Sequence, residues 1–427
     1  MEPSTLRRSL RAVFPDHCAV WCYGLGDEGT TGDAVALRRH AMHLMLKYDR
    51  NLAVRNPFEK FCRIVGTLAW PLNALIRAAA ATLAIRNQLP EPAARQPFRV
   101  FLQCWNCALR HNIAPKAFFK FRLFLDANRA RVRYYLQDHE MAYLVRAAWK
   151  KLDHKLTHTV NDKLEFFQFC QVNGVATVPV LAYCIDGKEI TAQTPVEQLT
   201  GDLMLKYTNS ASGEGVEMVA WNDATRDWRY NDQTIPTQRL AEVLRQKSVG
   251  RTAILQTKLM NHPDIKPLTG RGLSTVRMLT AVEPGDAGVP RVAAAGLRMS
   301  LGASVVDNMS AGGIASPINI ENGTLDSAVG KDIFKGWVNR HPDSGAKIGD
   351  AMLPFWRETC ELCVRTHALV KGIPTIGWDV AILADGPILI EANLGWDAEL
   401  VQLLGKTALG ETLAASALRH CLTPATH

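Results

Sequence analysis

The stretch GWDVAILADGPILIEANLGWD, from Gly377 to Asp397, predicts a β-hairpin. Two apolar runs, VAIL and PILIEAN, flank the turn sequence ADG. Because an antiparallel pair with a short turn brings its open ends side by side, Asp379 should lie near Glu391 and Asn393. Carboxylate and amide oxygens are ligands that Mg²⁺ prefers in proteins. The hairpin is therefore a candidate magnesium site, although a surface hairpin with solvated polar ends fits the same residues.

The composition is ordinary for a globular protein of two or three domains. The chain has 427 residues, of which 47% are hydrophobic and 21% are charged. The net charge is +8, and residues 1–150 hold 23 Lys and Arg against 11 Asp and Glu. A solvated helical surface explains this basic region most simply, and contact with a membrane or another anionic surface is the alternative.

The sequence indicates a cytoplasmic protein. Its first residues lack a continuous apolar segment followed by a small-residue cleavage site. The most apolar stretch, Ile64 to Ile85, contains Pro71 and Arg77 and predicts a buried or interfacial helix pair, not a membrane span. Ten cysteines in such a chain indicate reduced thiols. The pairs Cys104–Cys107 and Cys360–Cys363 lie in different thirds of the chain, which disfavours a zinc site.

A glycine pattern near the N-terminus resembles a dinucleotide-binding loop. Gly24, Gly26 and Gly29 have G-x-G-x-x-G spacing after a short apolar run. Asp27 and Glu28 would lie inside this loop and repel a phosphate, and no second strand of a βαβ unit follows. We therefore expect a surface turn that leads into a helix.

The pattern from Asp33 to Leu152 is mostly helical, and its aromatic stripe is more typical of a core than of a nucleic-acid-binding surface. After residue 160 it predicts a helix from Asp162 to Gly174 and a strand from Val178 to Tyr183. The segment GDLMLKYTNSASGEGVEMVAWND predicts two strands joined by a loop of small residues, with Lys206 near the end of the first strand. This loop, 209–215, suits the binding of phosphate oxygens by backbone N–H groups, and a plain hairpin loop is the alternative.

The C-terminal half predicts further strands that carry basic residues. TAILQTKLMNHPD predicts a strand that ends in a loop, and STVRMLTAVEP and VPRVAAAGLRMS predict two antiparallel strands with Arg277 and Arg298. If these arginines face a cleft, they would complement a phosphate or a carboxylate. If they do not, they are ordinary surface residues. The loop VDNMSAGGI follows, then a helix over residues 346–371, the opening hairpin, and a last helix from Glu411 to Cys421.

In this order, the elements resemble the ATP-grasp superfamily from about Asn161 to Leu404. Within it, QTKLMNHPDI, STVRMLT, VDNMSAGGI and GWDVAI…DGPILIEAN are similar to the sugar-transfer-associated ATP-grasp proteins. The resemblance implies an α+β fold in which two α+β subdomains clamp ATP, preceded by a mostly helical, basic N-terminal domain. The expected domains are 1–152, 153–258 with a phosphate lid, and 259–427 with the magnesium site and a terminal helix.

The resemblance also implies roles for individual residues. Arg298 and Lys206 would be catalytic, with Arg298 bridging the γ-phosphate and a developing acyl phosphate. Two lysines, the lid, the hinge strand and a ribose contact would bind ATP: Lys163, Lys206, Ser212, Gly213, Gly215, Gln256, Thr257, Lys258, Leu259 and Asp264. The magnesium ligands would be Asp379, Glu391 and Asn393. The acceptor substrate would meet Arg277, Asn308, Ser310, Gly312 and Gly313.

A carboxylate–amine ligase is the activity that the resemblance implies first. Such an enzyme uses ATP and Mg²⁺ to convert a small carboxylate, such as an amino acid, into an acyl phosphate that an amine attacks, releasing ADP. A kinase for a small molecule and a non-catalytic scaffold of glycan or membrane machinery are the alternatives. The expected partners are small-molecule substrates rather than nucleic acid, and a homodimer is compatible with the sequence.

Overall fold

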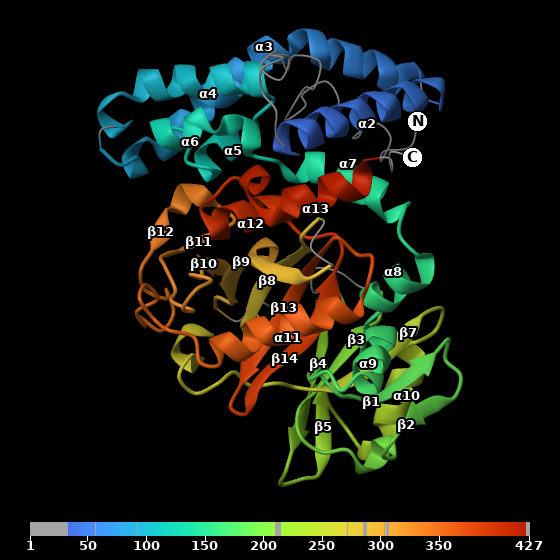
Figure 1. The fold of residues 1–427 in the computed structure, drawn as a ribbon. Coiled ribbons are helices and arrows are strands. Elements are labelled where there is room, and N and C mark those ends of the chain that lie inside the picture. Colours follow the sequence, from blue (N-terminus) through green and yellow to red (C-terminus); the bar gives the residue numbers. More distant parts are fainter. Residues whose placement is uncertain are drawn as a thin grey trace.

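The computed structural model describes residues 33–423, apart from residues 56, 92, 210–214, 271, 285–287, 303 and 305–306. It has a helical layer at one end, a seven-stranded sheet in the middle and another seven-stranded sheet at the other end (Figure 1). The glycine pattern at Gly24, Gly26 and Gly29 lies outside the described residues, as do Ser212 and Gly213.

The helical layer, at the top of Figure 1, confirms the mostly helical N-terminal region. The apolar stretch from Ile64 to Ile85 belongs to one continuous helix, α3, and the predicted helix pair is wrong. Pro71 normally disrupts a helix, but Trp70 and Ala74 on either side of it are fully buried against α4. The helices of this layer are α2 (Asp33–Arg55), α3 (Pro57–Ile85), η3 (Arg86–Gln88), η4 (Ala93–Arg95), α4 (Pro97–His111), α5 (Pro115–Lys120), α6 (Asp126–Ala130), η5 (Val132–Tyr134) and α7 (Asp138–Trp149).

The helical layer and the middle sheet share one hydrophobic core. Leu37 of α2 and Leu144 of α7 pack in the same cluster as Leu279 of β8 (Thr275–Val282) and Leu418 of α13 (Leu413–Leu422). Each of these side chains is at most 1% exposed. Because burying one such side chain contributes about 1.5–3 kcal/mol, this cluster holds the N-terminal layer firmly against the C-terminal sheet.

Gln402 of α12 (Ala398–Gly405) adds a buried polar link between the two layers. Its amide oxygen accepts hydrogen bonds from the backbone N–H groups of Leu136 and Leu409, each at 3.0 Å, and its amide nitrogen donates to the carbonyl of Leu136. Replacing Gln402 by Leu leaves these buried backbone groups unpaired, so we expect a loss of about 3 kcal/mol in unfolding free energy. Thermal unfolding measures it, and Gln171→Leu at an exposed position is the control; equal stability of the two variants would contradict the link.

The sheet at the lower end has the strand order β2-β1-β7-β3-β4-β5-β6, and its neighbouring strands are antiparallel. The helix α10 (Thr237–Lys247) covers it, and Leu240 and Leu244 pack in one cluster with Trp228 and Leu255. The strands β3 and β4 confirm the two strands predicted on either side of residues 209–215. The strands are β1 (Val180–Ile185), β2 (Ile190–Ala192), β3 (Leu203–Tyr207), β4 (Glu217–Asn222), β5 (Asp227–Tyr230), β6 (Gln233–Ile235) and β7 (Thr252–Thr257), with η6 (Val196–Gln198) between β2 and β3.

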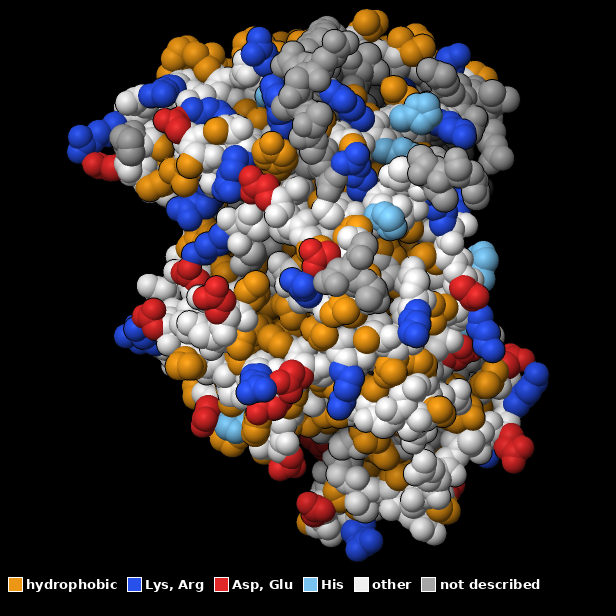
Figure 2. All heavy atoms as spheres, in the orientation of Figure 1, with side chains coloured by type: hydrophobic (Ala, Val, Ile, Leu, Met, Phe, Trp, Pro, Cys, Tyr) orange, Lys and Arg blue, Asp and Glu red, His pale blue; other side chains and the backbone are white. Residues whose placement is uncertain are grey.

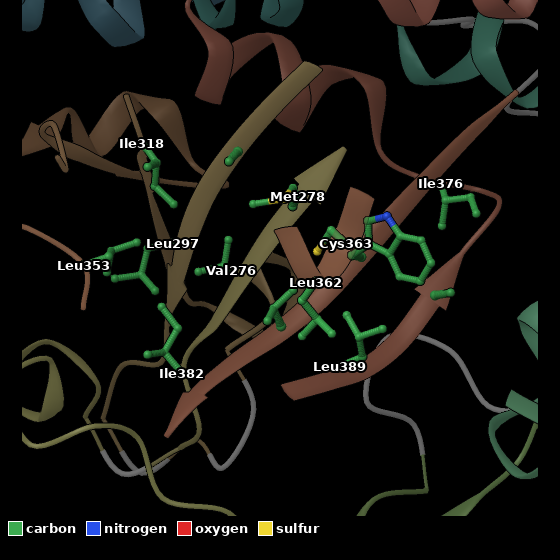
Figure 3. Close-up of a cluster of buried hydrophobic side chains, with 14 of the residues drawn as sticks. Val276, Met278, Leu297, Ile318, Leu353, Leu362, Cys363, Ile376, Ile382 and Leu389 are labelled. Carbon is green, nitrogen blue, oxygen red and sulfur yellow. The ribbon is translucent and has the colours of Figure 1, made fainter. Parts of the chain in front are cut away.

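The middle sheet has the order β12-β11-β10-β9-β8-β13-β14, also with antiparallel neighbours. Figure 3 shows Val276, Leu297 and Leu389 from three of its strands pointing toward the same core as Leu362 of α11 (Trp356–Leu369). The other strands are β9 (Pro290–Met299), β10 (Ile314–Pro317), β11 (Ala328–Gly330), β12 (Trp337–Val338), β13 (Thr375–Leu383) and β14 (Gly386–Asn393), with short helices η7 (Lys266–Leu268), η8 (Met309–Ala311), η9 (Ile333–Lys335) and η10 (Leu409–Glu411).

The opening hairpin is confirmed as β13 and β14, with Asp379 directly opposite Glu391. Two helix predictions need correction. The helix predicted over residues 346–371 begins only at Trp356, because Phe355 before it has a left-handed backbone (φ 52°) that a helix cannot continue through. The helix α12 was not predicted, although Asp397 caps its N-terminus by accepting a hydrogen bond from the N–H of Leu400.

Two helices lead from the helical layer into the lower sheet, α8 (His154–Asn161) and α9 (Lys163–Val172). Asp162 caps α9 by accepting hydrogen bonds from the N–H groups of Leu164 and Glu165, at 2.9 and 3.0 Å. This cap fixes the start of α9 and with it the position of Lys163, and it agrees with the helix predicted from Asp162.

A buried polar chain ties α11 to the middle sheet. The indole of Trp378 donates to the hydroxyl of Thr280 at 2.7 Å, and that hydroxyl lies 2.7 Å from Nδ1 of His367. Nε2 of His367 lies 2.9 Å from the carbonyl oxygen of Ile373 and donates to it, since a carbonyl only accepts. Nδ1 is then the acceptor for Thr280, so the imidazole is neutral. Burial lowers the pKa of His367 to about 4.

Acid is expected to weaken the fold through His367. The unfolded chain takes up a proton near pH 6.5 and the folded chain only near pH 4, so this group's contribution to stability is complete above pH 6.5 and is lost between these values. The expected loss between pH 7 and pH 5 is about 2 kcal/mol. Urea unfolding of the wild type and of His367→Gln at both pH values measures it. The variant should lose less stability than the wild type on acidification, and equal losses would contradict the assignment.

Candidate active site

A cavity of about 920 Å³ opens between the two sheets and reaches the helical layer. Side chains of the lower sheet form one wall, among them Met204 and Lys206 of β3, and side chains of β8, β9, β13 and β14 form the other. The predicted site residues that line this cavity are Lys163, Lys206, Thr257, Lys258, Leu259, Arg277, Arg298, Asn308, Asp379, Glu391 and Asn393.

Strand register assembles the charged centre of the cavity. In the middle sheet, Arg277 lies opposite Asp379, which lies opposite Glu391, and Thr275 lies opposite Arg298. Residues opposite each other or two apart on a strand share one face of a sheet. Side chains that lie as far as 116 residues apart in the sequence therefore form one group on the cavity side.

Two arginines hold the carboxylate of Asp379. Nε of Arg277 lies 2.9 Å from Oδ1 and an NH2 group of Arg298 lies 2.9 Å from Oδ2. Burial raises the pKa of Asp379 to about 6, against the opposing effect of both arginines. Oδ1 accepts no well-aligned hydrogen bond within the described part of the chain, despite the close Arg277. An oxygen of Asp379 is thus left for another partner.

Glu391 is ionised and open to the cavity. Its side chain is 28% exposed, and one of its oxygens lies 3.5 Å from Nζ of Lys163. Burial acts to raise its pKa, but the charges of Lys163 and Arg277 outweigh this effect and lower the pKa to about 2. The amide of Asn393 donates to the other oxygen of Glu391 at 3.4 Å.

The oxygen atoms of Asp379, Glu391 and Asn393 fit a hard cation such as Mg²⁺. They offer two carboxylates and one amide, and Mg²⁺ commonly takes one or two protein carboxylates together with substrate phosphates. No cluster of three Asp, Glu, His or Cys side chains suited to a metal ion occurs among the described residues. Two carboxylates and one amide fill only part of an octahedral Mg²⁺ shell, so phosphate oxygens or water would complete it.

Arg298 is fixed by a network that includes two residues not predicted from the sequence. Its side chain donates to the hydroxyl of Thr275 at 2.6 Å and lies 3.3 Å from Oδ1 of Asp307. Thr275 in turn donates to Asp307 from both its N–H and its hydroxyl, at 2.8 and 2.6 Å. Burial acts to lower the pKa of Arg298, but Asp307 and Asp379 outweigh it and raise the pKa further. The guanidinium is permanently charged and held in one orientation.

The two predicted phosphate-binding lysines face the same centre from the other side. Lys163 begins α9, and Lys206 lies in β3. Burial lowers the pKa of Lys206, the nearby charge of Glu391 raises it and the charge of Lys163 lowers it. Two ammonium groups close to each other and to Arg277 and Arg298 form a strongly positive region that suits a polyphosphate.

The predicted adenine-binding strand lies at the end of β7. Thr257, Lys258 and Leu259 line the cavity, whereas Gln256 is buried between β1 and β3. Lys258 pairs with Asp202 at 2.9 Å.

Besides Gln256, two further residues of the predicted ATP set lie outside the cavity lining. The side chain of Asp264 is 75% exposed and lies outside this lining, 3.7 Å from His262. Gly215, at the end of the predicted lid, has φ 68°, and a Cβ there would lie 2.4 Å from the ring of Tyr207, so this position requires glycine.

Only some of the predicted acceptor residues line the cavity. Asn308 lines the cavity and Ser310 lies in η8, but Gly312 and Gly313 are not in the lining. Gly313 packs so tightly that a Cβ would lie 2.5 Å from the carbonyl oxygen of Asp307. Arg277, also predicted to face the acceptor, lines the cavity and lies beside Asp379 in the charged centre.

A family of known proteins matches this architecture. The model for sugar-transfer associated ATP-grasp proteins matches residues 149–416, which is well over half of the chain. The chain belongs to this family. The resemblance inferred from the sequence motifs is thereby confirmed, together with the α+β ATP-grasp fold and its helical N-terminal region. Among curated proteins, none matches the sequence.

Solved structures show a distant likeness. A RimK domain ATP-grasp protein from Sphaerobacter thermophilus is 12% identical, with 63% of this chain and 70% of that chain covered and a TM-score of 0.34. D-alanyl-alanine synthetase A from Vibrio cholerae is 11% identical over 62% and 66%, with a TM-score of 0.35. An L-amino acid ligase from Bacillus licheniformis is 13% identical over 60% and 50%, with a TM-score of 0.32.

In this ATP-grasp protein, the helical layer supplies part of the cavity wall. Lys120 of α5 and Asp138 of α7 line the cavity together with Asp397 and Glu399 at the start of α12. Lys120 pairs with Glu399 at 2.9 Å. Asp138 and Glu399 cap each other's helices, with N–H to carboxylate distances of 3.0 and 3.4 Å. No signal in the sequence indicates this contact, because its partners lie 261 residues apart.

Asp138 has an unusual environment for a carboxylate. Solvent in the cavity reaches its side chain, but the surrounding walls still desolvate it. This desolvation, together with the negative charges of Asp397 and Glu399, raises the pKa of Asp138 to about 8. This end of the cavity is lined by the carboxyl groups of Asp138, Asp397 and Glu399, whereas the centre of the cavity is basic.

Proposed function

We propose that this protein is an ATP-dependent, ADP-forming ligase that joins a small carboxylate to an amine through an acyl phosphate. The observation that carries the proposal is one cavity in which four cationic side chains surround two carboxylates and an amide: Lys163, Lys206, Arg277, Arg298, Asp379, Glu391 and Asn393. Such a charge pattern suits phosphoryl transfer, where catalysis is mainly positioning and neutralisation of charge.

The nucleotide takes the side of the cavity formed by the lower sheet. Lys163 and Lys206 bind its phosphates, and the family resemblance assigns Ser212, Gly213 and Gly215 to a phosphate lid. The segment Thr257, Lys258 and Leu259, which lines the cavity, contacts the adenine edge. The lid serves to exclude water, because water would hydrolyse an acyl phosphate.

Magnesium is proposed to bind at Asp379, Glu391 and Asn393. When bound, it neutralises phosphate charge and polarises the phosphoryl group that is transferred. Two features of these residues support the assignment: Glu391 is ionised, with a pKa of about 2, and Oδ1 of Asp379 lacks an aligned donor.

The chemistry needs two displacements. A carboxylate oxygen of the substrate attacks the γ-phosphorus of ATP, the bond to the β-phosphate oxygen breaks, and ADP leaves. The amine nitrogen then attacks the acyl carbon, the carbon–oxygen bond breaks, inorganic phosphate leaves and the nitrogen loses a proton. Arg298 binds the transferred phosphoryl group and the oxyanion that forms at the acyl carbon. It is suited to this role because Thr275, Asp307 and Asp379 fix its guanidinium before the substrates bind.

The acidic end of the cavity supports an amine as the second substrate. The carboxylates of Asp397 and Glu399 lie there, opposite the basic centre, and Lys120 neutralises only part of their charge. A cationic amine is attracted to such an end and repelled by the arginines. Asn308 and the segment Ser310 to Gly313 are proposed to contact the same substrate beside Arg277. We place the reaction in the cytoplasm, because all eight cysteines that the structure describes are free thiols.

Product analysis tests this proposal. The purified protein is incubated with ATP, Mg²⁺ and pairs of small carboxylates and amines, and ADP, phosphate and organic products are quantified. A ligase releases ADP and inorganic phosphate in equal amounts with one amide. A kinase releases ADP and a phosphorylated product without inorganic phosphate, and that result would replace the ligase proposal. Magnesium-dependent ATP binding without ADP release for any substrate pair would favour a scaffold.

A further inference from the structure

An exposed apolar ridge runs along the helical layer on α3. Seven large apolar side chains on it are between 42% and 72% exposed: Phe58, Phe61, Ile64, Leu68, Leu72, Ile76 and Leu83. Their spacing of mostly three or four residues places them along one face of the helix. The opposite face packs inward, where Trp70, Ala74 and Ala78 are fully buried. Large apolar side chains gathered on a surface mark an interaction site, whereas single ones do not.

The ridge suits contact with a membrane surface rather than insertion across a membrane. The segment Pro57–Gln88 is long and apolar enough to span a bilayer, but only by length and composition. Spanning would strip Trp70 and Ala74 from their contacts with Trp105 and Ala108 of α4, and would break the hydrogen bond from the indole of Trp105 to the carbonyl of Pro71 at 3.1 Å. A helix of 29 residues lying flat instead presents an apolar edge roughly 44 Å long.

The surroundings of the ridge are strongly basic. Residues 51–135 contain 14 Lys and Arg but only three acidic residues. Each of these acids already has an arginine partner: Glu59 with Arg63, Glu91 with Arg95 and Asp126 with Arg129. Glu59, the only acid on α3, is also buried. On the face shown in Figure 2, blue basic and orange apolar side chains lie side by side over the helical layer.

Acidic residues of the C-terminal part neutralise some of this positive charge, but an excess of positive charge remains. Lys120 and Arg131 pair with Glu399 and Glu411 of the C-terminal part, at 2.9 and 2.8 Å. The cations near the ridge itself include Lys60 and Arg86, both exposed at opposite ends of the apolar stretch.

We propose that the α3 ridge, defined as Phe58 to Leu83, docks this protein on an anionic lipid bilayer. Apolar side chains of a surface helix insert among acyl chains to about 5–10 Å, and basic side chains beside them contact anionic headgroups. A second copy of the chain is a poorer occupant, because a dimer about this ridge brings two strongly basic surfaces together. This inference is independent of the proposed catalytic reaction.

Vesicle co-sedimentation of the full chain tests the proposal. Vesicles of phosphatidylcholine with 30% phosphatidylglycerol are expected to bind the protein, and binding should weaken at least tenfold with phosphatidylcholine alone or with rising salt. Two variants separate the contributions. The double variant Leu68→Glu with Leu72→Glu removes two apolar side chains from the ridge. The double variant Lys60→Glu with Arg86→Glu reverses two charges beside the ridge and leaves its apolar side chains in place. Each is expected to lower the affinity at least tenfold. Val172→Glu, at a position 86% exposed on α9, is the matched control.

The outcomes decide between the occupants of the ridge. Circular dichroism first establishes that the ridge variants are folded, and their ATP turnover should equal that of the wild type. Absence of vesicle binding by the wild type, or binding that both ridge variants retain in full, overturns the proposal. A concentration-dependent dimer that Leu68→Glu with Leu72→Glu dissociates, without vesicle binding, assigns the ridge to a second copy. Binding only after removal of residues 1–32 assigns it to that segment instead.

Discussion

Replacing Glu391 by Gln is expected to lower ATP turnover at least about a hundredfold while leaving the fold intact. Glutamine keeps the size and the hydrogen-bonding reach of the side chain, so packing on β14 should not change. It removes the negative charge that faces Lys163 at 3.5 Å and that is proposed to hold Mg²⁺. The residual activity should require more Mg²⁺ than the wild type needs, because a neutral amide is a weaker ligand.

A coupled assay of ADP release over a range of Mg²⁺ concentrations measures this effect. Glu197→Gln is the matched control, because Glu197 is exposed in η6 and remote from the cavity lining. The thermal unfolding midpoint of both variants should stay near that of the wild type. Wild-type turnover by a folded Glu391→Gln protein would show that the magnesium assignment is wrong.

Replacing Arg298 by Ala is expected to destabilise the protein by about 3–5 kcal/mol, even without substrates. Arg298 is 5% exposed and is shared between Asp307 and Asp379. Without Arg298, less positive charge balances the two buried carboxylates of Asp307 and Asp379. The hydroxyl of Thr275 also loses the hydrogen bond that Arg298 donates to it. For a domain of this size the thermal midpoint should fall by roughly 10 °C.

A double variant shows whether buried charge is the cause. Adding Asp307→Ala to Arg298→Ala removes one of the stranded carboxylates, so the pair should be less destabilised than the sum of the single variants. Arg357→Ala is the control, because Arg357 forms only an exposed ion pair with Glu361 and should cost at most about 1 kcal/mol. Equal stability of Arg298→Ala and Arg357→Ala would contradict the account of the network.

The sequence allowed the prediction of local elements and of residue types near the site. The hairpin of β13 and β14 was predictable because its two apolar runs and its turn are adjacent in the chain. Asp379, Glu391 and Asn393 followed from it, since the register of a short hairpin is nearly fixed by its turn. The family motifs added the lysines and Arg298, which come from elements that no local pattern links to the hairpin.

Long-range placement is what the sequence did not reveal. The register of β8 against β13 places Arg277 beside Asp379, a neighbour that no local sequence pattern indicates. Asp307 directly precedes the predicted loop residue Asn308, yet its importance depends on Thr275 and Arg298 in other strands. The contribution of the helical layer to the cavity, through Lys120 and Asp138, rests on how two distant parts of the chain pack together.

The origin of the oxygen in released phosphate tests the central claim most directly. A carboxylate that supports ADP release is labelled with ¹⁸O at both oxygens, and the phosphate formed in unlabelled water with ATP, Mg²⁺ and the amine is analysed by mass spectrometry. An acyl phosphate intermediate transfers one carboxylate oxygen to each phosphate, so the account predicts one ¹⁸O per phosphate. Phosphate without ¹⁸O would show that ATP does not activate the carboxylate, and would contradict the ligase mechanism.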